Sequence, residues 1–399
     1  MSRMNQPSTT ATSGTDYTSN ERLRKRYRAE RRFKAICMAA LGIAVAFLIV
    51  FFADIITTGL SAFKQTEIRV ELTINEQTLE IPPLAVNEAA RPFVSRGVFR
   101  GLPRQVRDNP DLMGTTQTTW VLATADVDQF RKGNEQALDE RDHAALAELE
   151  AVGDLRFVFN RWLFTNGDSL IPEMSGLYSA IIGSLLVLVI TMAFAFPVGV
   201  MSAIYLEEFA PDNWLTRAIE ININNLAAVP SIIFGLLGLA IIINFLGAPR
   251  SSALAGGLTI GLMTLPIVII STRAALRAVP DSIRQGALAM GATRWQTVRD
   301  HVLPMSIPGI LTGSIIGMAQ AIGETAPLLL VGMIAFIPDA PGSFTEAATV
   351  MPAQIYTWAT RPEAAYVERT AAAILVLLTV LIILNATAVY LRRRFERRW

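Results

Sequence analysis

Six long, mostly apolar runs of the chain contain a single charged residue between them. They cover residues 35–53, 174–206, 221–249, 251–272, 302–338 and 370–391, and the exception is Glu324 in the fifth run. A helix needs about 20 apolar residues to cross the hydrocarbon core of a bilayer. The pattern therefore predicts six transmembrane helices, with the first placed at residues 35–60.

The segment 61–173 breaks this pattern because it contains 12 basic and 18 acidic residues and no run long enough to span. Residues 66–74 (TEIRVELTI) and 77–86 (QTLEIPPLAV) alternate between apolar and polar positions. This alternation predicts two strands joined by a short turn at Asn75-Glu76.

Residues 134–153 predict an amphipathic helix, because apolar side chains recur on one face. These side chains are Leu138, Ala145, Leu146 and Leu149. We therefore expect an α+β domain inserted between the first and second spans. Its carboxylates favour a solvated acidic surface over a cation site.

Composition agrees with a membrane protein, since 52% of the residues are hydrophobic and 17% are charged. The one cysteine, Cys37, excludes an intramolecular disulfide and is expected to be a small buried hydrophobic residue. His143 and His301 lie far apart in the sequence and predict no metal or haem site. The net charge of +1 gives no indication of a nucleic-acid partner.

The distribution of basic residues predicts the orientation in the membrane. Nine lie in the tail 1–34, five in the tail 392–399 and five in 273–304. Six spans place all three segments on one side, which the positive-inside rule makes cytoplasmic. Residues 61–173 then form a large loop on the opposite, periplasmic side.

The cytoplasmic loop 280–304 has the pattern of two short helices. Asp281 or Ser282 can cap the first, Gly291 separates the two, Thr293 can cap the second, and Leu303-Pro304 is expected to end it. Such a helix pair, carrying Arg284, Arg294 and Arg299, suits docking to a carboxylate-lined groove of a soluble partner. A pair lying on the membrane surface with snorkelling arginines is equally compatible.

The spacing in this loop resembles the EAA loop of ABC importer permeases. Gly286-Ala287, three residues, Gly291, nine residues and then His301-Val302-Leu303-Pro304 follow the family pattern, with Gln285-Gly286-Ala287 in place of Glu-Ala-Ala. The resemblance implies that this loop couples the chain to an ATPase. The candidate coupling residues are Gly286, Ala287, Gly291, Arg294, Leu303 and Pro304.

Two more stretches, 224–238 (NNLAAVPSIIFGLLG) and 323–330 (GETAPLLL), look like phosphate-type permeases of the A-type. The resemblance covers about residues 175–392 and implies a MetI-like permease core at 174–391 in a bacterial inner membrane. It also implies a C-type permease partner, a periplasmic phosphate-binding protein and an ABC ATPase dimer that uses ATP and Mg. The chain itself has no Walker A motif, and we expect a transport subunit with no bound cofactor rather than an enzyme.

Glu324 is the main candidate for the substrate path, together with its neighbours Gln320 and Thr325. A charge inside a membrane is costly, so it should face a wet cavity or pair with a neighbouring helix. A carboxylate can accept the O–H of protonated phosphate and repel an ion without that proton. Members of the family often have an arginine where this chain has Gln320, so the compensating cation is expected from another chain.

Ser231, next to Pro230, is a weaker candidate. Its hydroxyl could form a polar position on the path, but it could equally bond back to its own helix. Three other functions stay open: a permease for molybdate, sulfate or phosphonate, an intramembrane hydrolase, and a sensor based on residues 61–173. The GETAPLLL stretch, the lack of a second intramembrane acid or His, and the coupling loop argue against them in turn.

Overall fold

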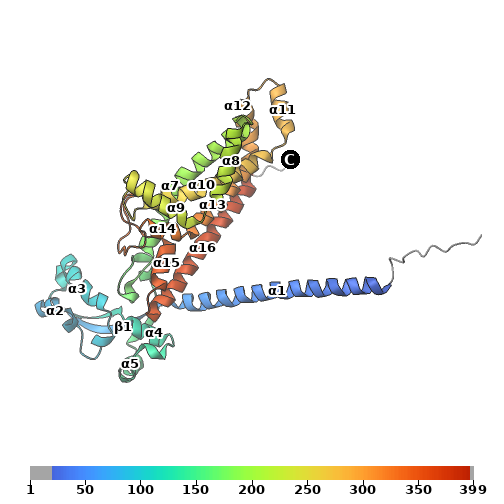
Figure 1. Cartoon of the computed structure of the whole chain (residues 1–399). Helices are drawn as coiled ribbons and strands as arrows, with labels where there is room; N and C mark the ends of the chain where they lie inside the picture. Colours follow the sequence, from blue (N-terminus) through green and yellow to red (C-terminus); the bar gives the residue numbers. More distant parts are fainter. Residues whose placement is uncertain (1–19, 396–399) are drawn as a thin grey trace, which may run out of the picture. The chain divides into compact units, whose positions relative to one another are not determined.

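The computed structural model describes residues 20–395 (Figure 1). Residues up to Asp54 form one compact unit and residues from Ile55 onward form another. The first unit contains most of helix α1 (Asn20–Ser61). Cys37 on this helix is exposed within the chain, so the prediction that it is buried is wrong for the chain alone. It lies in an apolar run whose side chains are exposed within the described part of the chain.

Four further helices are long and apolar enough to span a membrane. Their bounds are α7 (Tyr178–Ile204), α10 (Ala253–Arg277), α13 (Leu303–Gly323) and α16 (Ala364–Phe395). Together with α1 they account for five of the six predicted spans.

The third predicted span is a broken helix. Helix α8 (Trp214–Ala227) and helix α9 (Ser231–Leu237), which continues as the π-helical segment η7 (Gly238–Phe245), are bent by 107°. The break lies at Pro230, which lacks an N–H and disfavours a helical conformation in the residue before it. The described part of the chain therefore has five helices that are long and apolar enough to span, or six if the bent pair counts as one span.

The fifth predicted span, residues 302–338, is helical over only part of its length. Helix α13 stops at Gly323, and a short helix α14 (Ala326–Leu330) follows the break. The chain then forms turns and an extended stretch until α15 (Met351–Ala359). Pro327 in the first turn of α14 accounts for the break, because a continuous helix would need the N–H that proline lacks to bond the carbonyl of Gly323.

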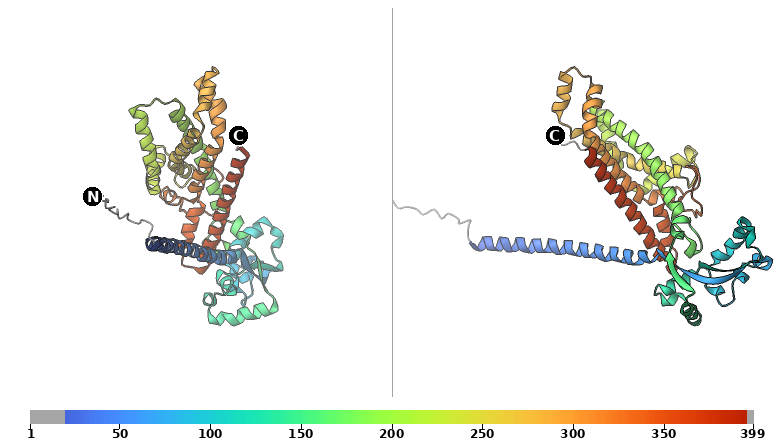
Figure 2. Two further views of the ribbon diagram at one scale, coloured as in Figure 1. Left: turned by 90° about the vertical axis from the view of Figure 1, so that its right-hand side faces the viewer. Right: turned by 180° about the vertical axis from the view of Figure 1, so that it is seen from behind.

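Helix α10 lies at the centre of the bundle and packs against α7 and α13 (Figure 2). Glycines allow the close approach. A Cβ at Gly313 of α13 would lie 2.2 Å from Cβ of Ser271, and a Cβ at Gly257 of α10 would lie 2.6 Å from Cβ of Ile190. Small residues at helix contacts are typical of membrane bundles, in which van der Waals packing drives association.

Residues 61–173 form an α+β domain with a three-stranded antiparallel sheet. Strand β1 (Lys64–Thr73) lies between β2 (Thr116–Leu122) and β3 (Leu155–Phe159). Five α-helices accompany the sheet: α2 (Glu76–Glu80), α3 (Arg96–Asp108), α4 (Ala125–Arg131), α5 (Glu140–Val152) and α6 (Trp162–Thr165). Short 3-10 turns occupy Pro82–Ala85, Arg91–Phe93, Pro110–Leu112, Glu135–Ala137 and Pro172–Met174.

The predicted strand at 66–74 is confirmed as β1, but the predicted strand at 77–86 is wrong. That stretch forms α2 and a 3-10 turn, because Asn75 caps the helix. Its side chain accepts a hydrogen bond from Thr78 N at 2.8 Å, and Asn75 N donates back to Thr78 Oγ1 at 2.8 Å. This capping box starts a helix at the position where the apolar alternation indicated a turn.

The predicted helix within 134–153 is confirmed as α5. Leu138 lies just before the helix rather than on it, yet it packs against the same apolar core as Ala145, Leu146 and Leu149. The four apolar side chains therefore have the predicted role in the core.

The loop 280–304 forms the predicted pair of helices, α11 (Asp281–Ala289) and α12 (Arg294–Thr297). Two details differ. Pro280 occupies the capping position instead of Asp281 or Ser282, and the helical conformation does not end at Leu303-Pro304. A π-helical turn η8 (Val298–Val302) continues α12 into α13, and such a wider turn tolerates the N–H that Pro304 lacks.

Candidate substrate path and coupling segment

Glu324 lies at the break between two helices rather than within one. Its backbone is extended (φ −74°, ψ 128°) and directly follows α13, and Thr325 precedes α14. Glu324 and Thr325 are half-buried and Gln320 is exposed. Within residues 20–395 the Glu324 carboxylate has neither a hydrogen bond nor an ion pair. The described part of the chain therefore supplies no cation to it.

The break at Pro230 lies in the same part of the bundle as the break at Glu324. A Cβ at Gly235 of α9 would lie 2.8 Å from Cα of Pro327 in α14. Val229, just before Pro230, packs against the apolar cluster that contains Leu328. Two helices that both begin in the middle of an apolar run are thus packed on each other.

Ser231 is the first residue of α9 and is half-buried. Its hydroxyl makes no hydrogen bond to the described part of the chain, including its own helix. The alternative in which Ser231 is bonded back to its helix is therefore not what the structure has. The structure places Ser231 on the helix that packs against α14.

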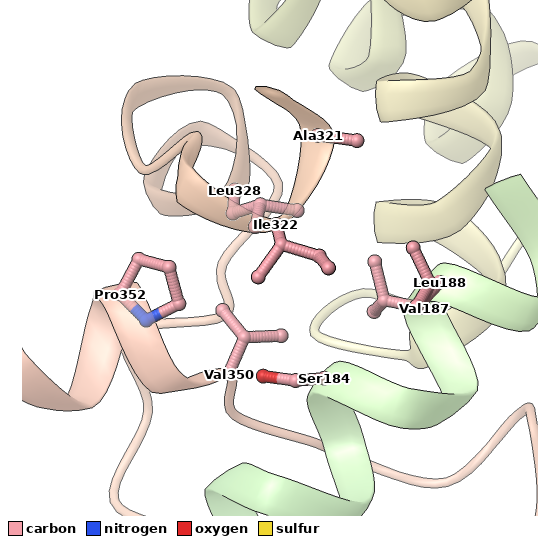
Figure 3. A pocket seen from close by; sticks show the side chains of 8 residues that line it. All are labelled: Ser184, Val187, Leu188, Ala321, Ile322, Leu328, Val350 and Pro352. Atoms are coloured by element: carbon pink, nitrogen blue, oxygen red, sulfur yellow. The ribbon is translucent and has the colours of Figure 1, made fainter. Parts of the chain in front are cut away.

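A small cavity of about 20 Å³ lies beside this region (Figure 3). Its lining is apolar except for the hydroxyl of Ser184, which accepts a hydrogen bond from Met351 N at 2.8 Å. The lining residues are Ser184, Val187, Leu188, Ala321, Ile322, Leu328, Val350 and Pro352. A cavity of this size holds about one water molecule. It does not include Glu324, Gln320, Thr325 or Ser231.

The tip of the loop formed by α11 and α12 presents apolar side chains to the outside of the chain. Met290 is 89% exposed and Trp295 is 57% exposed, whereas Ile283 and Ala287 are half-buried. Gly291 joins the two helices at φ 87°, a conformation that favours glycine. Thr293 and Gln296 then form a capping box that fixes the start of α12.

Gly286 and Arg294 on this loop face open space. A Cβ at Gly286 would meet nothing within 4 Å, so packing within the chain does not require glycine there. The exposed Arg294 has no ion-pair partner in the described part of the chain. Leu303 and Pro304 lie at the start of α13 instead, where the loop joins the bundle.

Arg284 differs from the sequence-based expectation of a free surface charge. Its guanidinium pairs with Glu208 at 2.8 Å and donates to the carbonyls of Leu276 at 2.8 Å and Val279 at 2.7 Å. The hydrogen bond to Glu208 raises the pKa of Arg284 further above its usual range. Arg284 therefore attaches α11 to the ends of α7 and α10.

Sequence reasoning missed two groups of polar residues that join separate helices by ion pairs and hydrogen bonds. One is the set of acids at the end of α7 and on α8: Glu207 and Glu220 pair with Arg273 and Arg277 of α10, and Glu208 pairs with Arg284 of α11. The available signal was Glu207-Glu208 at the end of one apolar run and two arginines one helical turn apart at the end of another.

The other group joins the α+β domain to α15 and α16. Asp168 accepts hydrogen bonds from Ser175 Oγ and Trp358 Nε1, both at 2.9 Å, and pairs with Arg361 at 3.3 Å. Lys132 of the domain lies 2.8 Å from Glu368 of α16. No local sequence pattern connects Asp168 with Trp358 or Arg361, or Lys132 with Glu368, which lie 190 or more positions apart, so these pairs were not predictable.

Comparison with known families defines the class of this membrane protein. The model for "Binding-protein-dependent transport system inner membrane component" matches residues 195–398, which is more than half of the chain. The chain therefore belongs to this family of helical transport permeases, whose members are membrane components of transporters rather than enzymes. A second model, described as a domain of unknown function (DUF3333), matches residues 20–89 and 80–140.

Curated relatives include phosphate permeases. The chain is 34% identical to "Phosphate transport system permease protein PstA 1" of Mycobacterium tuberculosis over 57% of this chain and 75% of that protein. It is 36% identical to PstA of Mycobacterium leprae over 54% and 71%, respectively. It is also 34% identical to "Probable ABC transporter permease protein YqgH" of Bacillus subtilis over 44% of this chain, and it spans only 58% of the length of that relative.

Among solved structures, the chain is similar to one titled "Inward facing conformations of the MetNI methionine ABC transporter". The TM-score is 0.43 at 19% identity, covering 55% of this chain and 98% of that chain.

Proposed function

We propose that this chain is the A-type permease subunit of an ATP-driven, binding-protein-dependent phosphate importer. The observation that carries the proposal is its 34–36% identity to PstA proteins over more than half of its length. The GETAPLLL stretch, which suggested the A-type from sequence, forms the break and helix around Glu324.

The proposed assembly contains a C-type permease partner, two ATPase subunits that hold ATP and Mg, and a periplasmic phosphate-binding protein. Figures 1 and 2 show α11 and α12 at one end of the helix bundle and the α+β domain at the other. This supports a cytoplasmic loop 280–304 and a periplasmic domain 61–173 in a bacterial inner membrane. The basic residues of the tails 1–34 and 392–399 support a cytoplasmic position for both chain termini.

Docking of the ATPase to α11 and α12 is supported by their outer surface. Met290 and Trp295 are exposed at the tip, Gly286 has open space around it, and Arg294 is unpaired within the described residues. Aromatic, methionine and arginine side chains are enriched at the centre of protein interfaces. A small residue at Gly286 allows a partner to approach the backbone of α11 closely.

In the proposed path, the carboxylate of Glu324 accepts a hydrogen bond from the O–H of protonated phosphate. An ion without that proton, such as sulfate, meets an uncompensated negative charge there. Gln320, Thr325 and Ser231 supply further polar groups near the two helix breaks. Because Glu324 lacks a cation in the described part of its own chain, the attraction for the anion is assigned to the C-type partner.

Reconstitution tests this function directly. The chain is co-expressed with a C-type permease and an ATPase of the proposed assembly, and the purified complex is placed in proteoliposomes with the binding protein. ATP-dependent uptake of labelled phosphate that exceeds uptake of sulfate and molybdate is the expected result. Uptake of molybdate, sulfate or phosphonate in preference to phosphate would overturn the substrate assignment.

A paired substitution tests the docking surface in the same preparation. Met290→Asp should reduce co-purification of the ATPase, because it places a charge at the centre of an apolar contact. Leu170→Asp is the matched control, because Leu170 is 72% exposed but lies in the α+β domain. Equal recovery of the ATPase with both variants would contradict docking at α11 and α12.

A further inference from the structure

A single side chain makes the polar contacts that join the loop helix α11 to both α7 and α10. Arg284 binds the carboxylate of Glu208 with both Nε and Nη2, at 3.3 Å and 2.8 Å from Oε1. The same guanidinium donates to the carbonyl of Leu276 in the last turn of α10 and to that of Val279 just beyond it. It therefore holds the ends of α7 and α10 together with α11.

This contact is largely shielded from solvent. The Arg284 side chain is 19% exposed and that of Glu208 is 9% exposed. Ile283, the preceding residue, packs against an apolar cluster formed by Leu276, Val279 and Val302, with Ile204 of α7 beside it. A charge-assisted bidentate contact beside an apolar contact is stronger and more rigid than a pair in water.

A second set of ion pairs continues from this point into the bundle. Glu207, adjacent to Glu208, pairs with Arg273 at 3.1 Å and Arg277 at 2.7 Å. Arg273 in turn pairs with Glu220 of α8 at 2.5 Å. Through these residues α11 connects to α7, α10 and α8, and α8 leads to the break at Pro230.

The π-helical turn η6 (Tyr205–Phe209) at the end of α7 carries both acids. It presents Glu207 to α10 and Glu208 to α11. Single π-turns within helices are often found at functional sites. Here the wider turn accounts for how two consecutive acids serve two different helices.

We infer that Arg284 is a positioning residue that transmits movement of the loop helix α11 to α7 and α10, through Glu208 and the two carbonyls. This inference rests on the proposed function, because it needs an ATPase that moves α11. It assigns a mechanical role to a side chain inside the permease, separate from the residues that touch the ATPase.

Glutamine at position 284 would keep a polar side chain but lose the charge and the fork of donors. Lysine would keep the charge, yet a single ammonium group cannot reproduce the planar bidentate contact and both carbonyl contacts. Without this connection, α11 can follow the ATPase while α7 and α10 lag behind. ATP hydrolysis then continues and transport per ATP falls.

The experiment measures phosphate transported and ATP hydrolysed in the same proteoliposomes, with the whole complex. Arg284→Gln and Glu208→Gln should each lower phosphate transported per ATP by about tenfold, as expected for loss of a partly buried charged hydrogen bond. Arg284→Lys should restore part of that ratio. Co-purification of the ATPase should stay at the wild-type level for all three.

Arg217→Gln is the matched control, because Arg217 also pairs with an acid but both side chains are exposed, at 69% for Arg217 and 79% for Asp212. It should leave the ratio unchanged. If the Arg284 variants keep the wild-type ratio of phosphate transported per ATP, whether or not both rates fall, the inference is wrong. A wild-type complex that transports no phosphate would instead contradict the proposed function.

The variants could fail through a general loss of structure, and a cross-link removes that ambiguity. Glu208→Cys and Arg284→Cys are combined with Cys37→Ser and joined by a short bifunctional thiol reagent. If the contact transmits movement without opening, the cross-linked complex should recover transport per ATP relative to the unlinked one. Loss of transport on cross-linking would overturn the inference.

Discussion

Lys132 of the α+β domain and Glu368 of α16 form an ion pair with Nζ and Oε1 2.8 Å apart. Their side chains are only 12% and 8% exposed, and Lys132 also contacts Asp128 at 2.6 Å. Gln129 donates a hydrogen bond to the other oxygen of Glu368. The domain is thus bonded to a spanning helix at a site largely shielded from water.

Replacing Lys132 with methionine should weaken this junction strongly. Asp128 and Glu368 would both lose their shared cation, and breaking a buried pair costs about 3–5 kcal/mol. Faster limited proteolysis of residues 61–173 in the purified protein is the measurement. Arg104→Gln is the control, because its 4.0 Å pair with Asp108 is exposed, and it should change little. Equal proteolysis rates for the two variants would show that the pair does not hold the domain.

The contact between α10 and α13 predicts a second effect. Gly313→Val would place atoms within about 2 Å of Ser271, so the helices must separate, at a cost typical of overpacking of about 1–3 kcal/mol. Gly42→Val on α1 is the control, because a Cβ there meets nothing within 4 Å. The midpoint of thermal unfolding in detergent should fall for Gly313→Val and stay unchanged for Gly42→Val. A fall of equal size in both would indicate an effect of helix propensity instead.

Glu173 gives a prediction for pH. Burial raises the pKa of its carboxyl, while Ser95 and Arg369 lower it by a smaller amount. A raised pKa in the folded state stabilises the fold below the unfolded pKa of about 4.3, and this stabilisation is lost as pH rises through the folded pKa. Glu173→Gln keeps a neutral side chain at every pH. It should therefore be more stable than wild type at neutral pH and equal to it in acid.

Thermal unfolding between acid and neutral pH measures this difference. Glu148→Gln, an exposed position on α5, is the control and should run parallel to wild type. If the difference in thermal stability between Glu173→Gln and wild type does not narrow as pH falls, the Glu173 carboxyl is not the source of the pH dependence.

Sequence predicted well those elements of the fold whose formation depends mainly on one local feature of the chain. Apolar runs of sufficient length located the spans α1, α7, α10 and α16, because hydrocarbon excludes charge regardless of tertiary context. The helix pair α11–α12 was predictable because Gly291 marks the turn between the two helices and Thr293 marks the start of the second. The breaks at Pro230 and Glu324 were not, since proline within a membrane helix can bend it, break it or leave it intact.

The candidate site was predictable in residue type but not in geometry. Glu324 stood out as a charge in an apolar run, yet its position between two helices depends on Pro327 in the first turn of α14. The role of Arg284 depends on Glu208 and on the end of α10, which are brought to it only by the folded bundle. Long-range ion pairs carry no local sequence signal.

Substitutions of the two glycines in the loop 280–304 distinguish an effect of backbone strain from an effect on contact with the ATPase. Gly291→Ala forces alanine to φ 87°, which costs about 1–2 kcal/mol and should distort the turn and reduce ATPase recovery. Gly286→Ala is free of clashes within the chain and should stabilise α11 slightly. A bulky Gly286→Trp should block docking although the permease itself folds. Full ATPase recovery with Gly286→Trp would exclude close approach at this position.

Glu324→Gln tests the substrate path. The amide keeps the size of the side chain but removes the negative charge that discriminates against an anion with no proton to donate. Uptake of phosphate relative to sulfate should fall by about tenfold, as for loss of one charge-assisted hydrogen bond. Assembly should be intact, because Glu324 has no ion-pair partner in the described part of this chain. Competition of sulfate with labelled phosphate in reconstituted complexes is the measurement, and Glu148→Gln, the same substitution at an exposed position on α5, is the control. Unchanged selectivity in Glu324→Gln with normal uptake would remove Glu324 from the path, because a carboxylate that touches the anion cannot be neutralised without changing which anions pass.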